Sequence, residues 1–231
     1  MMPFMYKPVI CFDLDDTLYK EQDFLKSAFQ EIAVYVESCI NVPYENIYNV
    51  LISAFQNNKN AFDALNEQYN IHIPIETYLK IYREHKPNIL PLPGVLEMLA
   101  FFKNKGSILG LISDGRSVTQ RNKIKSLKIE CFFNDDNIII SEEFGTSKPS
   151  KSNYQYFSDR YPGRQFFYIG DNTHKDFVVP NELGWTSICL LDDGNNIHQQ
   201  DFLGDESCLP SYRIHDIKEV IDILKKVYKK F

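Results

Sequence analysis

The fold is decided by residues 9–19, VICFDLDDTLY, in which a short apolar run ends abruptly in carboxylates. Such a run predicts a buried strand that delivers acidic residues to the edge of a sheet. Asp13 and Asp15 are two positions apart, so an extended backbone points both side chains to the same side. Converging carboxylates repel each other unless a cation neutralises them or one holds a proton. The pattern suggests a nucleophile, a general acid or base and a divalent cation, although a solvated Asp-rich turn explains it equally well in isolation.

Further strand signals recur along the chain, with helical stretches between them. The expected strands cover residues 8–14, 107–113, 137–141, 165–170, 186–191 and 212–214. The middle ones are continuous apolar runs, which indicates burial on both faces, as in a parallel sheet covered by helices. The sequence therefore predicts an α/β fold with a doubly wound parallel sheet. We expect Pro149 to start a helix, and a last helix over about 216–230 with Asp216 as its N-cap.

Residues 20–90 break this alternation, because they contain no strong strand signal. They are predicted to form helices at about 21–39, 44–57, 60–69 and 75–86. A stretch of this length is too long for a loop. The sequence therefore predicts a catalytic core made of residues 1–18 and 91–231, with a helical cap, residues 19–90, inserted beside the acidic site.

Bulk composition restricts the classes of function. The chain has 231 residues, 44% hydrophobic and 24% charged, as in an ordinary globular protein. The formal net charge of −6 argues against nonspecific binding to nucleic acid or to an anionic membrane. Five dispersed cysteines without a C-x-x-C pair fit reduced thiols and argue against a zinc site. No segment has the apolar length of a membrane span and no signal peptide is evident, so we expect a cytoplasmic protein.

Three further signals follow expected strands. Ser113 ends the second strand before a glycine and a helix, which suits an anion, although helix capping by Ser113 or Ser117 is the simpler explanation. Lys148 precedes a predicted helix and could bridge a nucleophile and a phosphoryl oxygen. Asp171 and Asp176 follow the fourth strand and add hard oxygen ligands of the kind that Mg²⁺ prefers. All these signals fall at the C-terminal edge of one parallel sheet, where α/β proteins bind ligands.

Taken in order, the motifs DLDDTL (13–18), ISDG (112–115), KP (148–149) and GD (170–171) with Asp176 resemble those of the haloacid dehalogenase (HAD) superfamily. The resemblance covers the whole chain, including a helical cap between the first and second motifs. It departs at Asp114, where many relatives have asparagine. It implies a Rossmann-like core and the following roles.

By this resemblance, Asp13 attacks phosphorus to form an aspartyl-phosphate, and Asp15 protonates the leaving oxygen and then activates water. The phosphoryl group is bound by Ser113, Asp114, Gly115 and Lys148. The cofactor is Mg²⁺, held by Asp13, the carbonyl oxygen of Asp15, Asp171 and Asp176, the last of which orients the metal shell or Lys148. These roles agree with the needs of phosphoryl transfer, which are positioning and charge neutralisation.

Asp15 also distinguishes between reactions within the family. The family's dehalogenases lack an acid at that position, because a halide leaves without a proton, whereas an ester oxygen needs one. We therefore expect a phosphatase for a small phosphomonoester, such as a nucleotide or sugar phosphate, acting as a monomer or homodimer with no nucleic-acid or membrane partner. The alternatives are a phosphomutase, a dehalogenase well behind it and, from another class, a non-catalytic phospho-ligand sensor.

Overall fold

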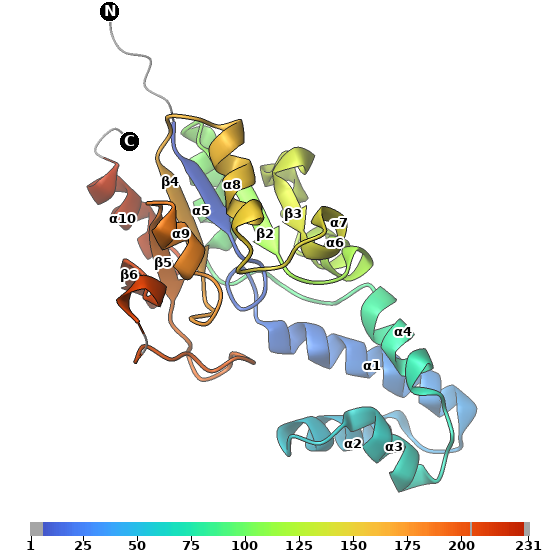
Figure 1. Ribbon diagram of the computed structural model, residues 1–231. Helices are drawn as coiled ribbons and strands as arrows, with labels where there is room; N and C mark the ends of the chain where they lie inside the picture. Colours follow the sequence, from blue (N-terminus) through green and yellow to red (C-terminus); the bar gives the residue numbers. More distant parts are fainter. Residues whose placement is uncertain (1–6, 204, 229–231) are drawn as a thin grey trace, which may run out of the picture.

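The computed structural model describes residues 7–203 and 205–228 and is built on one parallel sheet (Figure 1). Its strands are β1 (Val9–Phe12), β2 (Ile108–Ser113), β3 (Ile138–Ile140), β4 (Phe166–Gly170), β5 (Thr186–Leu190) and β6 (Tyr212–Ile214). They are arranged in the order β3-β2-β1-β4-β5-β6, and every neighbouring pair is parallel. Since the order reverses beside β1, the sheet is doubly wound, which confirms the predicted fold class.

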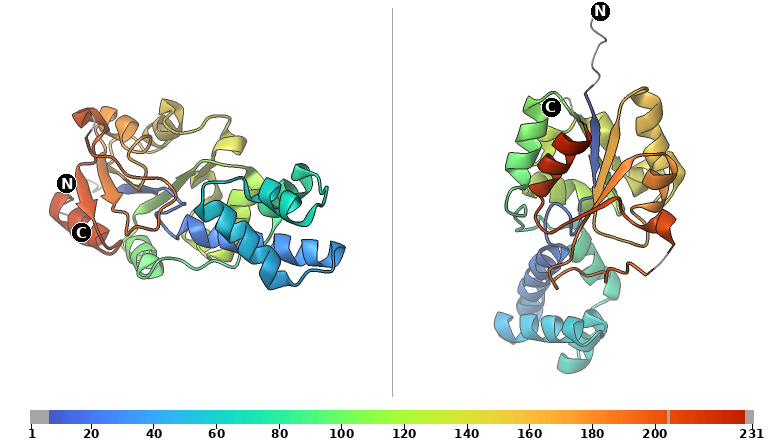
Figure 2. Two further views of the ribbon diagram at one scale, coloured as in Figure 1. Left: turned by 90° about the horizontal axis from the view of Figure 1, so that it is seen from below. Right: turned by 90° about the vertical axis from the view of Figure 1, so that its left-hand side faces the viewer.

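Helices cover both faces of the sheet because its strands are apolar on both sides. In β1, Ile10 and Phe12 face one apolar cluster, whereas Val9 and Cys11 face the other. The first cluster is covered by α5 (Val95–Asn104), α6 (Ser117–Ser126) and α10 (Glu219–Val227), and the second by α8 (Lys151–Arg160) and α9 (Val178–Glu182). Figure 2 shows α5 and α10 on one side of the sheet and α8 on the other.

Four helices between β1 and α5 form a unit that lies off the C-terminal edge of the sheet (Figure 1). They are α1 (Glu21–Cys39), α2 (Tyr44–Gln56), α3 (Ala61–Tyr69) and α4 (Ile75–Glu84). This helical insert has its own apolar cluster, to which Phe29, Leu51 and Tyr78 contribute. The chain enters and leaves it side by side, since Leu92 N donates to Leu18 O at 2.9 Å. The division into core and cap near residues 18 and 91 remains a prediction.

Two predicted helix starts are wrong. Pro149 does not begin a helix: Ser147–Ser150 form a turn, with Ser150 N donating to Ser147 O at 2.9 Å, and α8 begins at Lys151. Asp216 does not cap α10, because its carboxylate accepts from Lys218 N within a turn that precedes the helix. The predicted end of the last helix, residues 229–230, lies outside the described residues.

A few small features shape the edge of the sheet near β1 and β4. Asp16 has a positive φ of 52°, and its carboxylate accepts from Glu21 N at 2.9 Å and from Ile197 N at 3.0 Å. It therefore ties the loop after β1 to the first turn of α1 and to the loop between β5 and β6. At Gly170, a Cβ atom would lie 2.5 Å from Asp176 Oδ2, so only glycine leaves room for that carboxylate.

Candidate active site

The carboxyl ends of β1, β2 and β4 bring Asp13, Ser113 and Asp171 together, because these three strands are neighbours. Asp13 and Asp171 line a cavity of about 210 Å³ at this edge of the sheet, whereas Ser113 is buried and is not part of the lining. The walls of the cavity are strongly acidic and consist of Asp13, Asp15, Asp16, Glu21, Asp114, Asp171, Asn172, Lys175 and His198. The position and polarity of this cavity are those expected of a ligand site in a doubly wound sheet.

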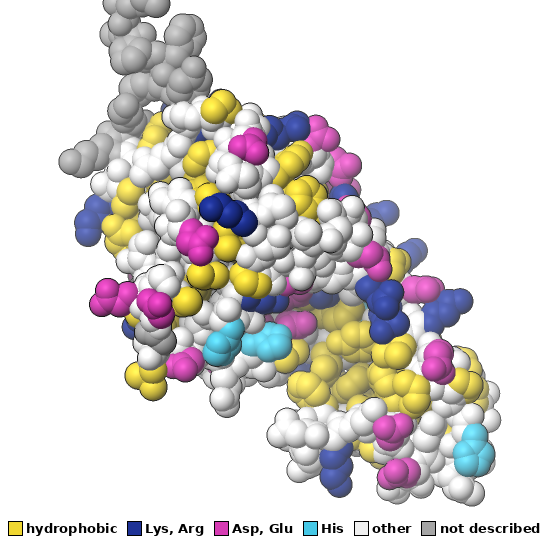
Figure 3. All heavy atoms as spheres, viewed as in Figure 1, with side chains coloured by type: hydrophobic (Ala, Val, Ile, Leu, Met, Phe, Trp, Pro, Cys, Tyr) yellow, Lys and Arg dark blue, Asp and Glu magenta, His cyan; other side chains and the backbone are white. Residues whose placement is uncertain are grey.

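The surface around the sheet edge differs in character from the surface of the insert. Figure 3 shows acidic and histidine side chains at the border of the core, where it meets the helical insert. On the insert, the same view shows hydrophobic side chains gathered close to that border. The acidic edge of the core thus lies beside a more apolar surface of the helical insert.

Lys148 lies behind the cavity as a buried cation between two carboxylates. Its Nζ is 2.6 Å from Asp13 Oδ1 and 2.8 Å from Asp176 Oδ1, and it donates to the Tyr168 hydroxyl at 3.1 Å. Its side chain is only 1% exposed. The backbone holds it there, since Lys148 N donates to Asp114 Oδ1 at 2.9 Å. The geometry thus fixes a positive charge directly against Asp13.

Carboxylate oxygens of Asp13, Asp171 and Asp176 all lie within 4.8 Å of one another. Burial raises the pKa of Asp13 to about 7, with further increases from Asp176 and Asp15 that Lys148 partly offsets. Burial and the nearby charges of Asp13 and Asp176 raise the pKa of Asp171 to about 9. Three crowded carboxylates facing a buried ammonium leave an excess of negative charge, which a hard divalent cation such as Mg²⁺ would neutralise.

The three carboxylates are not equally available to a cation. Asp176 is 0% exposed and is already bound by Lys148, Tyr168 and the backbone N–H of Asn172, which donates to Asp176 Oδ2 at 2.9 Å. Among the described residues, only Asn196 donates a hydrogen bond to the Asp171 carboxylate, from Nδ2 at 3.1 Å. We therefore expect Asp13 and Asp171 to be the direct ligands, and Asp176 to hold Lys148.

Asp15 also lines the cavity, but its side chain binds a different set of groups. Lys123 Nζ lies 2.7 Å from Oδ1, Gln120 Nε2 donates to Oδ2 at 2.9 Å, and the Tyr19 hydroxyl donates to Oδ1. Burial alone would raise the pKa of Asp15, but the Lys123 ammonium and the hydrogen bonds from Lys123, Tyr19 and Gln120 together lower it. The arrangement stabilises Asp15 as an anion in a defined orientation.

The motif after β2 is used differently from the expectation. Ser113 Oγ is buried and accepts from Gln120 Nε2 at 2.5 Å, which leaves its own proton to donate. Asp114 lines the cavity, and its Oδ2 accepts from Lys175 Nζ at 3.0 Å. Gly115 N donates to Ser141 Oγ at 2.9 Å. This amide is therefore already occupied, whereas we expected it to bind a phosphoryl oxygen. Gly115 instead makes room for Gln120, whose Cδ would lie 3.1 Å from a Cβ atom there.

The N-terminus of α6 does not point at an anion in the cavity, contrary to the expectation. Ser117 N donates to Glu142 Oε2 at 2.8 Å, and the Ser117 hydroxyl donates to Glu143 Oε1 at 2.6 Å. A carboxylate of the same protein thus already binds the first backbone N–H of the helix. In a serine N-cap, the serine oxygen accepts a hydrogen bond from a backbone N–H. Here Ser117 instead donates, and the acceptors are the side chains of Glu142 and Glu143.

Sequence reasoning missed several residues at this site: Gln120, Lys123, Lys175 and His198, with Glu21 from the first turn of α1. A signal for two of them was present. Gln120 and Lys123 fall in the same helical stripe as Ile124 and Leu127, which are buried in the core. Polar residues in the register of an apolar stripe face inward with it.

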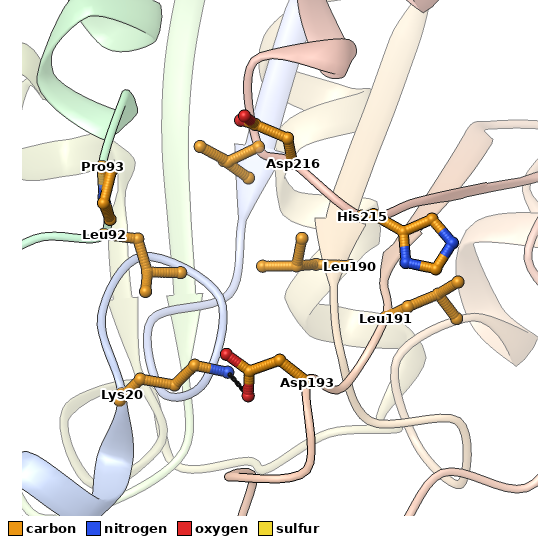
Figure 4. A pocket seen from close by; sticks show the side chains of 9 residues that line it. Lys20, Leu92, Pro93, Leu190, Leu191, Asp193, His215 and Asp216 are labelled. Carbon is orange, nitrogen blue, oxygen red and sulfur yellow. Dashed lines mark hydrogen bonds and ion pairs between the residues drawn. The ribbon is translucent and has the colours of Figure 1, made fainter.

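A second cavity, of about 220 Å³, lies where the helical insert joins the core (Figure 4). Lys20 and Asp193 point toward each other there, with 2.8 Å between Lys20 Nζ and Asp193 Oδ1, and Leu92 and Leu190 give the cavity an apolar side. It contains none of the sheet-edge residues Asp13, Ser113, Lys148 or Asp171. The acidic cavity is therefore the better candidate for the active site.

The C-terminal edge of this doubly wound sheet gathers carboxylates, a hydroxyl and a buried lysine, at the place where α/β enzymes bind their ligands. The family model for haloacid dehalogenase-like hydrolases matches residues 10–189, and the chain belongs to this family. Among the described residues, no helix combines the length and apolar character needed to cross a bilayer.

Similar proteins agree with this assignment. The glyceraldehyde 3-phosphate phosphatase of Methanocaldococcus jannaschii is 31% identical in an alignment that covers 95% of this chain and 98% of that protein. The pyrimidine 5'-nucleotidase YjjG of Escherichia coli is 24% identical over 94% of this chain and 97% of its own. The crystal structure of the putative HAD-hydrolase YfnB from Bacillus subtilis bound to magnesium has a TM-score of 0.64 at 21% identity and covers 95% of this chain and 99% of that one. This last likeness shows the shared fold.

Proposed function

We propose that this protein is a Mg²⁺-dependent phosphatase that hydrolyses a small phosphomonoester through an aspartyl-phosphate on Asp13. The observation that carries the proposal is the buried Lys148, held 2.6 Å from Asp13 at the edge of a carboxylate-lined cavity. A nucleophilic carboxylate next to a dianionic ester needs such a fixed positive charge, because phosphoryl transfer depends on positioning and neutralisation. Family membership and the phosphatases among the similar proteins support the same reaction class.

Mg²⁺ fits the oxygen-only donor set of Asp13 and Asp171, with the Asp15 carbonyl oxygen as the third expected ligand and Asp176 beside them. When bound, the cation would neutralise charge on the carboxylates and on the phosphoryl oxygens. No histidine or cysteine belongs to this cluster among the described residues, which favours a hard cation over zinc.

In the first step, a carboxylate oxygen of Asp13 forms a bond to phosphorus as the ester P–O bond breaks. The departing oxygen takes a proton from Asp15, and the Ser113 hydroxyl binds a phosphoryl oxygen. Lys148 would join it only by giving up one of its three contacts, which are with Asp13, Asp176 and Tyr168. The phosphoryl group itself favours the protonated form of Asp15, because a neighbouring negative charge disfavours the carboxylate anion.

In the second step, water attacks the aspartyl-phosphate. Its oxygen bonds to phosphorus, the bond from phosphorus to Asp13 breaks, and Asp15 takes the proton that water releases. The protein returns to its starting state with inorganic phosphate as product. The lowered pKa of Asp15 favours the anionic form, which this step requires of the base.

The helical insert would act as a cap over the cavity, because α1 begins beside it at Glu21. A cavity of about 210 Å³ suits a small phosphate ester, such as a triose phosphate, better than a large one. The similar proteins named as glyceraldehyde 3-phosphate phosphatases favour a sugar phosphate, and the nucleotidase favours a nucleotide. Cytoplasmic location and a monomeric or homodimeric state remain predictions.

The test is phosphate release from a panel of phosphomonoesters that includes glyceraldehyde 3-phosphate and pyrimidine 5'-monophosphates, with Mg²⁺ and with chelator. We expect release that requires Mg²⁺ and concentrates on one chemical group. Folded protein that binds Mg²⁺ and releases phosphate from no ester would overturn the proposal. It would shift the assignment to a mutase, a dehalogenase or a sensor.

A further inference from the structure

Lys123 on α6 is a buried cation that the proposed reaction has not used. Its side chain is 4% exposed, which is rare for lysine because removing an ammonium from water is costly. Aromatic side chains of the loop after β1 and of the insert cover it, since its Nζ lies 4.4 Å from the centre of the Phe24 ring and 5.8 Å from that of Tyr19. A charge kept in such a place calls for an explanation beyond stability.

The partner of Lys123 is Asp15, the expected general acid and base. Lys123 and Tyr19 bind one carboxylate oxygen, while Gln120 binds the other and also reaches Ser113. Asp15 therefore has donors on both oxygens and cannot rotate without losing at least one of them. Its side chain is still 20% exposed toward the cavity, so water or a bound ester can reach it.

Helix α6 is itself held firmly on the side that carries these donors. The Thr119 hydroxyl donates to Arg83 O at 2.9 Å, and Asn122 Nδ2 donates to His85 O at 3.0 Å. Ile124 and Leu127 anchor the next turn in the apolar core. The ammonium of Lys123 is thus placed by a helix fixed to both the core and the end of the insert, as a positioning group requires.

A purely stabilising role explains this pair less well. Burying an ion pair contributes little net stability compared with apolar residues of similar volume, because both charges lose their hydration. The gain from such a pair is a defined geometry. The ion pair with Lys123 fixes the orientation of the Asp15 carboxylate. Both proton transfers of the proposed function depend on this carboxylate.

We propose that Lys123 is a positioning residue that, through its ion pair, aims the Asp15 carboxylate at the leaving-group oxygen. This inference rests on the proposed phosphatase function. Lys123 keeps its own protons throughout, and the proton passes only between Asp15, the departing oxygen and water. Loss of Lys123 should therefore slow the hydrolysis of esters whose leaving group needs a proton more than that of esters whose leaving group does not. Since the same loss removes a charge that favours the Asp15 anion, such slowing reports lost orientation and not lack of the protonated acid.

The experiment compares two esters, glyceraldehyde 3-phosphate, whose alkoxide must be protonated, and p-nitrophenyl phosphate, whose phenolate leaves as an anion. The quantity measured is kcat/KM, which reports on steps up to the first irreversible one. In Lys123→Met we expect kcat/KM for the alkyl ester to fall about 30-fold or more and that for the aryl ester about 3-fold, within the range that general acid catalysis contributes. The ratio of the two values does not depend on how much of the variant is folded.

Two further variants sharpen the result. Lys123→Arg keeps a cation at the same helical position. Its ratio of kcat/KM for the alkyl ester to kcat/KM for the aryl ester should therefore lie closer to the wild-type ratio than that of Lys123→Met. Lys125→Met removes an exposed lysine from the same helix and should leave the ratio at the wild-type value. A Lys123→Met ratio equal to that of the wild type would overturn the inference alone. If the wild type does not hydrolyse glyceraldehyde 3-phosphate, the best alkyl ester of the panel takes its place. A wild-type protein that releases phosphate from no ester of the panel would overturn the proposed function, and the inference with it.

Discussion

Asp13 and Asp15 are separated by a single residue, yet their surroundings are electrostatically opposite. Around Asp13, the carboxylates of Asp171 and Asp176 outnumber the buried ammonium of Lys148, and the pKa of Asp13 is raised to about 7. Around Asp15, donors surround the carboxylate and its pKa is lowered. The surroundings of Asp13 have more carboxylates than cations, whereas both carboxylate oxygens of Asp15 already have hydrogen-bond donors. We therefore propose that one side of the cavity binds a cation, whereas the other fixes the orientation of the Asp15 side chain.

The backbone explains how two positions so close in sequence reach such different surroundings. Asp13 N still donates to Ile169 O at 2.8 Å, which keeps Asp13 in register with β4 and near Asp171. Leu14 is fully buried in the core and anchors the chain between the two acids. Asp15 then lies in the following loop, where it faces α6. Both acids line one cavity, as the alternation of the sequence predicts, but each is bound by a different layer of the fold.

Removing the nucleophile is expected to have the largest effect. Asp13→Asn should lower the rate of phosphate release about 10³-fold or more, because an amide cannot form the aspartyl-phosphate. Circular dichroism and thermal unfolding should show an intact fold, since the change removes one of the crowded carboxylates. Asp23→Asn, at an exposed position of α1, is the matched control and should turn over like the wild type. Release at the parent rate by Asp13→Asn would exclude the covalent mechanism.

Deleting the buried cation beside Asp13 should be the most damaging change to stability. Lys148→Met leaves Asp13 and Asp176 buried without their partner, so the free energy of unfolding should fall by about 3–5 kcal/mol. Urea unfolding at neutral pH in chelator measures it. Lys151→Met, which changes an exposed lysine, should stay near the wild-type value. Equal unfolding free energies for the two variants would mean that Lys148 does not neutralise the buried carboxylates.

Adding Mg²⁺ tests the charge imbalance directly. At about 100 times its dissociation constant, a cation that binds only the folded state raises stability by about 2.7 kcal/mol. Asp171→Asn should remove most of this gain, whereas Asp15→Asn should keep it because the Asp15 side chain binds Lys123 instead. Thermal unfolding with Mg²⁺ and with chelator provides the measurement. If both variants lost the gain equally, Asp15 and Asp171 would contribute alike to cation binding, and the two sides of the cavity would not differ.

The smallest effect concerns Glu21, which lies between the two environments. Burial, and then the charge of Asp15, raise the pKa of Glu21 from 4.5 to about 8. A folded-state pKa above the unfolded value contributes stability that is present below pH 4.5 and is lost as the pH rises through about 8. In chelator, Glu21→Gln should therefore become more stable than the wild type by about 1–2 kcal/mol between about pH 6 and 9.

The control for this prediction is Glu31→Gln, at an exposed position of α1. Its stability difference from the wild type should not change over the same pH range. A Glu21→Gln difference that is constant with pH would show that Glu21 ionises normally in the folded protein.

Much of the fold was predictable because its strands are continuous apolar runs and its insert is too long to be a loop. The positions of Asp13, Ser113 and Asp171 followed from a rule of topology, since parallel strands end at one edge. Lys148 lies in a loop beyond β3, so this rule does not place it. The partners of Asp15 did not follow, because they depend on the angle at which α6 packs on the sheet. The competition for the Gly115 amide was equally hidden, since Ser141 lies on a helix whose position the sequence alone does not define.

The two sets of contacts along α6 have a kinetic consequence. One turn of this helix holds the backbone at the end of α4, and the same turn holds the carboxylate of Asp15. A displacement of residues 83–85 would therefore be passed through α6 to Gln120 and Lys123. The entry of substrate beneath the insert and the orientation of the Asp15 carboxylate would then be coupled. If substrate enters by a movement of the insert, the turnover number would depend on that movement as well as on the chemistry at Asp13.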